Sequence, residues 1–509
     1  MKKNKIEDLV QFLRKFCLHQ SLAYIGAVQV NIFNEKSHLS KHYPQSINEW
    51  CLAFIAKILI LNSNDHRSKL FLEGDLLNAV NIYNNLNERI LGLVDESKRK
   101  EFNSNMYSFL IYTANQQFPL QSGIWPQIPR SYILFDFIPK EIKNPAIDIG
   151  KEIKKIYGLS VKEILILGFT IFATLKNGYF YPEYLINNNH NALKKITTKE
   201  NIFKLISKIS ADYNTLKKFF NEEEAREGYE KYSFNSLKSY PVVETQIGRM
   251  VIPVPRFLID ICTTGIYYNL MDRFKGSKSN AFLEFFGKEI FESYVGLLLK
   301  QKYGEEGLLK EWEYIKSRQV CKTSDWTIIC GNTAILIECK TSGINKEAKS
   351  FADLEQVQGN LRLRVVQAIK QMNTIVNNAK KSVKGLEKLF EINKFYFVVV
   401  TFDRIFLAGT PVIKELIQKE LDKINIRQCP DYQVISIEEL ENLIPFLDVF
   451  SFEYILGEKF KDKNWSTYDF DVFISHFLKD RGIDLRINNK LLMDKYNELF
   501  KGLRATILS

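Results

Sequence analysis

Residues 323–342 read TSDWTIICGNTAILIECKTS and decide the fold of this chain. Two apolar, β-branched runs flank Gly331-Asn332, a pair that suits a tight primed turn with positive φ. A two-residue turn fixes the strand register, which sets Asp325 directly across from Glu338. The sequence therefore predicts a β-hairpin in which two carboxylates oppose each other on adjacent strands.

The two strands of this hairpin, residues 325–330 and 333–340, present different faces because side chains alternate along a strand. One face is apolar throughout and is expected to be a core face; it carries Trp326, Ile328, Cys330, Ile335, Ile337 and Cys339. The opposite face places Lys340 beside Asp325 and Glu338. Nearer the turn, the same face carries Thr327, Ile329, Ala334 and Leu336.

The opposed carboxylates call for a cation. Like charges directly across from each other destabilise a strand pair, because their β-carbons lie only about 4.5–5.5 Å apart. A hard divalent cation such as Mg²⁺ binds through one or two carboxylates together with waters and substrate phosphate oxygens. Lys340 is placed to orient a water or to offset developing negative charge. The alternative is a solvated strand face on which Lys340 alone neutralises the pair.

Asp325, twelve intervening residues and Glu338-Cys339-Lys340 resemble the D…(D/E)xK signature of the PD-(D/E)xK, or restriction-endonuclease-like, nuclease superfamily. The resemblance implies an αβββαβ core that hydrolyses nucleic-acid phosphodiesters. It also implies that Asp325, Glu338 and a backbone carbonyl at Cys339 hold Mg²⁺, for which Mn²⁺ can substitute, and that Lys340 is the catalytic lysine. Ser324 stands where the signature usually has proline, which is a weak part of the signature.

A helix is expected over residues 281–300, AFLEFFGKEIFESYVGLLLK, and glutamates in so apolar a helix need partners. Residues 287–294, GKEIFESY, resemble the first motif of many members of the superfamily, in which a helix glutamate helps to complete the metal site. By that match we favour Glu292 as a metal ligand, followed by Glu289 and Glu284. Exposed glutamates that pair with nearby lysines would fit the same pattern.

A second helix is expected after the hairpin, over residues 361–379. Gln367 resembles the helix glutamine that several members of the superfamily place beside the catalytic lysine, which makes it a further catalytic candidate; a surface glutamine is the alternative. Residues 341–390 carry nine Lys and Arg against four Asp and Glu, an excess of five in a chain of formal net charge +11. This excess fits contacts to a phosphate backbone, and also a solvated basic helix face.

The chain has 509 residues, a length that favours more than one domain. We expect a mostly helical region over 1–275, a nuclease domain over 276–448 and a helical extension over 449–509. Within the nuclease domain, residues 311–319 are expected to form the first strand and 394–402 an interior strand. The predicted fold class is α/β (α+β): a largely helical N-terminal half, then an αβββαβ restriction-endonuclease-like core with a helical C-terminal extension.

The composition, 46% hydrophobic and 25% charged, is that of a soluble globular protein. Seven cysteines without metal-ligand spacing fit reduced thiols in the cytoplasm. The first residues, MKKNK, lead into no apolar segment, and no apolar run approaches the roughly 20 residues of a membrane helix, so we expect neither a signal peptide nor a membrane span. Isolated histidines, His19 among them, are expected to have structural or surface roles.

These patterns together predict a metal-dependent nuclease whose partner is nucleic acid, with DNA favoured. By analogy with the superfamily, bacterial restriction or anti-phage defence is the expected role, and a repair or junction-resolving nuclease is the nearest enzymatic alternative. A catalytically inert nucleic-acid-binding or scaffold protein is the alternative from a different class. Residues 1–270 carry no chemical motif and are expected to recognise, regulate or oligomerise, with a second copy or a protein as partner.

Overall fold

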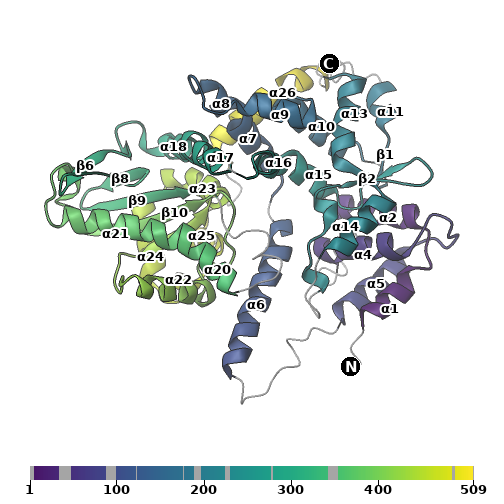
Figure 1. Ribbon diagram of the computed structural model, residues 1–509, viewed down its shortest axis with the longest axis horizontal. Coiled ribbons are helices and arrows are strands. Elements are labelled where there is room, and N and C mark those ends of the chain that lie inside the picture. The colour runs from purple at the N-terminus through teal and green to yellow at the C-terminus, as the bar shows by residue number, and fades with distance from the viewer. Residues whose placement is uncertain are drawn as a thin grey trace.

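The computed structural model describes residues 5–33, 47–86, 99–121, 123–175, 177–187, 197–223, 230–276, 279–341, 354–483 and 488–507. In this part of the chain, a helical half and an α/β half lie on either side of the long helix α6 (Arg99–Gln117) (Figure 1). Helix α6 contacts both: the Tyr107 hydroxyl donates to the Glu415 carboxylate at 2.7 Å, and the rings of Phe109 and Tyr232 meet edge to face.

Helices dominate the N-terminal half. With α6 they are α1 (Ile6–Leu13), α2 (Leu18–Phe33), α4 (Glu49–Asn62), α5 (Glu73–Asn84), α7 (Gln127–Tyr132), α8 (Ile138–Glu141), α9 (Ile149–Tyr157), α10 (Val161–Ala173), α11 (Pro182–Asn187), α13 (Lys199–Ile209), α14 (Tyr213–Glu222), α15 (Pro255–Cys262) and α16 (Gly265–Arg273). Several begin at a residue whose side chain accepts a backbone N–H of the first turn, as Asn48, Asp148 and Ser160 do. Among the described residues no single helix is long and apolar enough to cross a membrane; α9 and α10, bent by 49°, reach that length and composition as a pair.

A small sheet joins this half, with strand order β1-β4-β3-β2. Its strands are β1 (Tyr179–Phe180), β2 (Ser210–Asp212), β3 (Val242–Glu244) and β4 (Met250–Val251). The turn between β3 and β4 closes with a bond from the Gly248 N–H to the Thr245 carbonyl, and Gly248 has φ 73° there. This sheet and the first helices share an apolar cluster that contains Leu22, Ile55 and Val251.

The α/β half is built on a five-stranded mixed sheet of order β11-β10-β9-β8-β5. Its strands are β5 (Leu308–Lys310), β8 (Trp326–Cys330), β9 (Thr333–Lys340), β10 (Lys394–Thr401) and β11 (Tyr432–Ser436). Strands β9, β10 and β11 run parallel, whereas β5, β8 and β9 are antiparallel neighbours. The interior position expected for residues 394–402 is confirmed, since β10 pairs on both of its edges.

The single strand expected over residues 311–319 is wrong. Strand β5 ends at Lys310, and the chain then forms a separate two-stranded hairpin of β6 (Glu313–Lys316) and β7 (Gln319–Lys322). Ser317 and Arg318 both have positive φ, which makes the tight reversal between these strands. The alternation of side-chain types over residues 311–319 indicates a strand. Two adjacent non-glycine residues with positive φ are not recognisable from the sequence, so the turn that they form is not expected.

Helices cover both faces of the large sheet (Figure 1). They are α17 (Ser279–Phe285), the π-helical turn η7 (Phe286–Phe291), α18 (Glu292–Tyr303), α20 (Leu354–Leu361), the π-helical turn η8 (Arg362–Val366), α21 (Gln367–Ala379), α22 (Pro411–Lys423), α23 (Ile437–Leu443), α24 (Phe452–Lys461), α25 (Phe470–Lys479) and α26 (Lys490–Ile507). Ile335 and Val398 pack on one side with α18 and α23, and Leu336 and Phe397 on the other with α21 and α22. Strands covered on both sides explain the near-continuous apolar run of β10.

The hydrophobic core crosses the domain limits expected at residues 275 and 448. Tyr267 of α16 packs against Phe286 and Phe402, with ring centroids 4.9 and 4.7 Å away. A buried ion pair joins Arg130 of α7 to Glu441 of α23, and α26, yellow in Figure 1, lies against α7. The extension over 449–509 is helical, as expected, and packs as part of this shared core.

Candidate metal centre and active site

The hairpin of β8 and β9 has the turn and the register that the sequence predicts. Gly331 has φ 56° at the first turn position, which is the place of glycine in a type II′ turn. Trp326 pairs with Ile337, so one further step along the register sets Asp325, just before β8, across from Glu338. The Asp325 carboxylate reaches over to β9, where its Oδ2 accepts the Cys339 N–H at 2.7 Å.

The two faces of the hairpin also follow the prediction, with one correction. Trp326, Ile328 and Ile335 pack in one apolar cluster, and Leu336 packs in the other. The face that carries the charges is therefore also covered, and Glu338 is only 4% exposed. The solvated strand face expected as the alternative is therefore not present at Glu338.

Lys340 contacts Glu338, one member of the acidic pair, directly. Its Nζ donates to Glu338 Oε2 at 2.8 Å, and the side chain is largely withdrawn from solvent. Burial alone would lower the pKa of this ammonium group, but the charges of Glu338 and Asp325 outweigh burial and the pKa is raised. Lys340 therefore keeps its positive charge at neutral pH.

One lysine does not balance the carboxylates gathered here. Burial, followed by the charge of Asp325, raises the pKa of Glu338 to about 7 and that of Glu292 to about 8. Burial also raises the pKa of Asp325. Three carboxylates whose ionisation burial opposes, with mutual repulsion added at Glu338 and Glu292, form a hard oxygen donor set, and a divalent cation is a partner that such a set fits.

Of the three glutamates that the sequence left open, Glu292 is the one that lies near Asp325 and Glu338. Glu284 and Glu289 lie exposed on the helix, whereas Glu292 is partly buried and interacts electrostatically with Asp325 and Glu338. The π-helical turn η7 ends immediately before Glu292. Because a π turn widens the helix locally, it changes which face the following residues present, and such turns occur often at functional sites.

A close contact between α18 and β8 fixes the position of Glu292. The Trp326 indole N–H donates to the Glu292 carbonyl at 3.0 Å. One turn further along the helix, Gly296 lies flat against the same ring, where an added Cβ would stand 2.2 Å from Trp326 Cζ2. Only glycine lets the helix approach the strand so closely, and this approach brings the Glu292 carboxylate to the sheet.

Glu311 is a fourth acid in this region that sequence reasoning missed. Its backbone N–H donates to the Asp325 carbonyl at 3.0 Å, and Lys322 Nζ donates to its carboxylate at 2.7 Å. Its charge contributes to the raised pKa values of Glu292 and Glu338. The pairing of β5 with β8 places Glu311 beside Asp325, and this register was hidden because the first strand was expected to begin at residue 311.

Residues from both halves surround the end of β9 at Lys340. The Tyr267 hydroxyl of α16 donates to the Thr341 carbonyl at 3.4 Å, and the Phe402 N–H donates to the Lys340 carbonyl at 3.0 Å. Arg364 of η8 lies near Tyr267, and within the described residues its buried Nε has no hydrogen-bond partner. Residues 1–270, expected to carry no chemical motif, therefore contribute α16 to this end of β9.

Gln367 is not placed with the carboxylates by any contact that the structure records. It is the first residue of α21, its side chain is exposed, and among the described residues no hydrogen bond joins it to Lys340 or to the acids. Part of the basic stretch over 341–390, including Lys346 and Lys349, lies outside the described residues. In the described part of this basic stretch, the Arg362 side chain is 54% exposed, and its Nη1 lies 3.9 Å from Glu420 Oε2.

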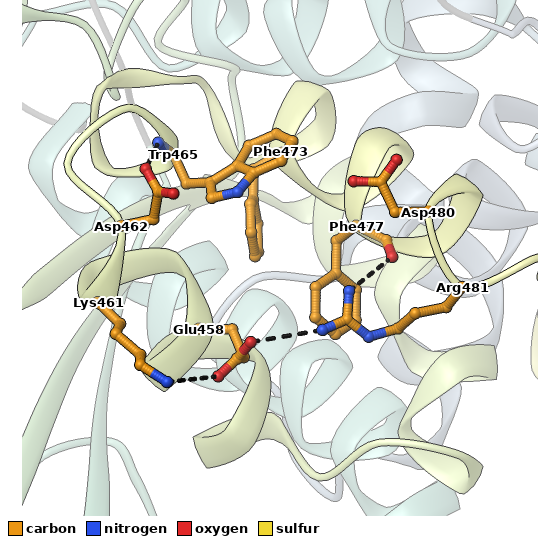
Figure 2. A pocket seen from close by; sticks show the side chains of 8 residues that line it. All are labelled: Glu458, Lys461, Asp462, Trp465, Phe473, Phe477, Asp480 and Arg481. Atoms are coloured by element: carbon orange, nitrogen blue, oxygen red, sulfur yellow. Dashed lines mark hydrogen bonds and ion pairs between the residues drawn. The ribbon is translucent and has the colours of Figure 1, made fainter.

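A separate pocket of about 330 Å³ opens among helices α24 and α25 and the turn that joins them (Figure 2). The Arg481 guanidinium lies 3.8 Å from the centre of the Phe477 ring, and its Nη2 donates to Glu458 at 3.4 Å. Trp465 packs edge-on against Phe473. The charged groups of Glu458, Lys461 and Arg481 are paired with one another in this pocket. None of the carboxylates described above lines it.

Neither a protein-family model nor a curated protein matches this sequence. A functional proposal for the chain must therefore rest on its own residues. The arrangement that offers most is the buried cluster of Asp325, Glu338, Glu292 and Lys340, which lies where β9 ends and β8 begins.

Proposed function

We propose that this chain is a metal-dependent nuclease of the PD-(D/E)xK type, which hydrolyses phosphodiester bonds of nucleic acid, DNA first. One observation carries the proposal: Asp325, Glu338 and Glu292 gather at one end of the sheet and influence one another electrostatically, and Lys340 forms an ion pair with Glu338 there. Solvent is largely excluded from this cluster. A structural ion pair needs one carboxylate for one lysine, so the additional acids point to a metal.

The donor set suits Mg²⁺, with Mn²⁺ as a substitute. Asp325, Glu338 and Glu292 would hold the ion through carboxylate oxygens, and the Cys339 carbonyl would add a fourth ligand from the protein. When bound, Mg²⁺ supplies a Lewis acid for the phosphoryl group and its attacking water. The Cys339 N–H keeps the Asp325 carboxylate turned toward β9. Lys340, held by Glu338, offers a fixed positive charge where negative charge develops during hydrolysis.

The residues around the cluster favour a polyanionic substrate. The chain carries a formal net charge of +11, which attracts nucleic acid by long-range electrostatics. Arg364, whose Nε has no hydrogen-bond partner among the described residues, lies beside Tyr267 and is well placed to meet a phosphate next to Lys340. A role in bacterial restriction or anti-phage defence follows by analogy with the superfamily, and the helical half is then the place for a protein partner or a second copy.

A cleavage panel tests the proposal. Supercoiled plasmid, linear duplex DNA, single-stranded DNA and RNA would be incubated with the full chain in Mg²⁺, in Mn²⁺ and in EDTA. We expect cleavage with either metal, none in EDTA, and loss in Asp325→Asn and Lys340→Ala. Glu289→Gln, an exposed glutamate on the same helical segment, is the matched control and should cleave at the parent rate.

Two outcomes would contradict the nuclease proposal. The first is full cleavage by the Glu338→Ala/Lys340→Ala double variant, which would place the activity elsewhere or in a contaminant. The second is Mg²⁺ binding by calorimetry that Asp325→Ala abolishes, together with no cleavage of any substrate. That result would instead support an inert nucleic-acid-binding scaffold that keeps its metal.

A further inference from the structure

A second group of metal-binding side chains lies in the helical half. Cys17 and His19 stand at the start of α2, and Asp65 lies in the turn after α4. Parallel β-bridges hold these two segments together, joining Phe16 to Lys69 and Cys17 to Asn64. His19, which is isolated in the sequence, thereby meets Asp65, a residue 46 positions further along the chain.

Two distances within this group fit ligand atoms that share one cation. His19 Nδ1 lies 3.3 Å from Cys17 Sγ and 3.3 Å from Asp65 Oδ1. The separation from the oxygen is longer than the usual range of about 2.7–3.2 Å for an N–H···O bond. Tetrahedral zinc, with bonds of about 2.3 Å to sulfur and about 2.0–2.2 Å to nitrogen and oxygen, sets neighbouring ligand atoms about 3.3–3.6 Å apart.

A cation would also balance the charge of Asp65, which its hydrogen bonds leave in place. Its side chain is 2% exposed, and within the described residues no lysine or arginine nitrogen lies within 4.0 Å of its carboxylate; His19 is the partner there. A buried carboxylate is costly unless it is paired or binds a metal. A zinc ion with one thiolate and one carboxylate would leave this buried site without net charge.

Other groups hold the Asp65 carboxylate in place. Oδ1 accepts the His19 N–H at 2.8 Å and the Tyr213 hydroxyl at 3.1 Å, and Oδ2 accepts the Gln246 N–H at 3.1 Å. Hydrogen-bond donors behind a ligating carboxylate fix its orientation, and this is the usual arrangement around protein metal sites. These bonds also connect α14 and the β3–β4 turn to the same point.

We propose that Cys17, His19 and Asp65 bind a zinc ion, at a site independent of the Mg²⁺ cluster. Three protein ligands leave one position of a tetrahedral ion for water or another ligand. The thiolate and imidazole select a softer ion than Mg²⁺, so the two sites would not compete for one metal. The ion would fasten α2, the turn after α4, α14 and the β3–β4 turn to one another.

Proton release accompanies binding. Burial raises the pKa of the Cys17 thiol above its usual value, so the metal-free site holds S–H. Zinc coordinates the thiolate, so the thiol proton passes to the buffer as the Zn–S bond forms.

Cobalt substitution in the full chain tests the site directly. The protein would be stripped with a chelator under reducing conditions and titrated with Co²⁺, then Zn²⁺. We expect a thiolate-to-cobalt charge-transfer band that saturates at one equivalent and disappears when Zn²⁺ displaces the cobalt. Cobalt bound by Asp325 and Glu338 lacks a thiolate and gives no such band, so failure of the nuclease proposal would leave this readout untouched.

Variants decide the outcome. Cys17→Ser should remove the band, and His19→Gln should weaken zinc binding by at least about 100-fold, since even the partners behind a ligand contribute about 10- to 100-fold. His66→Gln, an exposed histidine next to Asp65, is the matched control and should keep the band. Because His19 is partly exposed, the His19→Gln variant should fold even if Cys17→Ser, at a buried position, does not. Circular dichroism of each variant checks its folding. A missing band in the parent protein, or an equal band in His19→Gln and His66→Gln, overturns the proposal.

Discussion

Replacing Glu338 with glutamine should stabilise the metal-free protein while abolishing its activity. The pKa of Glu338 is raised from 4.5 to about 7, mainly by burial and secondly by Asp325. A carboxyl group with a raised folded-state pKa stabilises the fold at low pH, and this contribution is lost as the pH rises from about 4.5 through 7. A shift of about 2.5 units corresponds to about 3 kcal/mol. Glutamine stays neutral throughout and keeps a polar partner for Lys340.

Urea unfolding in EDTA, at about pH 5 and about pH 8, measures this difference. At the higher pH the free energy of unfolding of Glu338→Gln should exceed that of the parent by about 3 kcal/mol, and at the lower pH the two should nearly coincide. Saturating Mg²⁺ should stabilise the parent, by about 2.7 kcal/mol at a hundred times the dissociation constant, and the variant much less.

The reasoning would be refuted by a variant that is less stable than the parent at the higher pH in EDTA. Such a result would mean that the ion pair of Glu338 with Lys340 outweighs repulsion among the acids, so the cluster would be a structural salt bridge. Equal stabilisation of parent and variant by Mg²⁺ would show, independently, that Glu338 is not a ligand of the metal. Glu289→Gln, at an exposed position, controls for the change of residue type.

Two further predictions concern the supports of the site. Gly296→Ala should lower the free energy of unfolding by about 1–3 kcal/mol and weaken Mg²⁺ binding in calorimetry. The reason is that the added Cβ would displace the Trp326 ring that holds Glu292. Gly359→Ala, with no atom within 4 Å of its added Cβ, is the control and should have neither effect. Arg130→Met should destabilise the protein by about 3–5 kcal/mol in urea unfolding, since it leaves Glu441 buried without its cation, and Glu441→Gln added to it should recover much of the loss. A double variant no more stable than Arg130→Met would contradict this account.

The hairpin could be predicted from its sequence because its determinants are local. Gly331 fixes the turn, the turn fixes the register, and a period of two then assigns every side chain to a face. The same local argument sets Asp325 across from Glu338, as the strand pairing confirms. Glu292 followed from the resemblance of residues 287–294 to a superfamily motif, and its burial separates it from its exposed neighbours.

What could not be predicted depends on contacts distant in sequence or on unusual backbone angles. The pairing of Glu311 with Asp325 requires the register of β5, which no turn fixes. The positive φ at Ser317 gave no signal that would divide the expected strand. Asp65 meets His19 across 46 residues, through bridges between irregular segments that carry no periodicity.

The buried pair of Arg130 and Glu441 has a consequence for how this protein can be handled and how it can change. Tyr294 also donates to Glu441, so residues from three distant parts of the sequence meet at one charge. A fragment that begins after residue 275 would lack Arg130, the cation that pairs with this carboxylate. It would also expose the aromatic surface that packs against Tyr267. We expect such a fragment to aggregate on expression, and recombination near that point to be selected against, so that the helical half and the sheet are inherited as one unit.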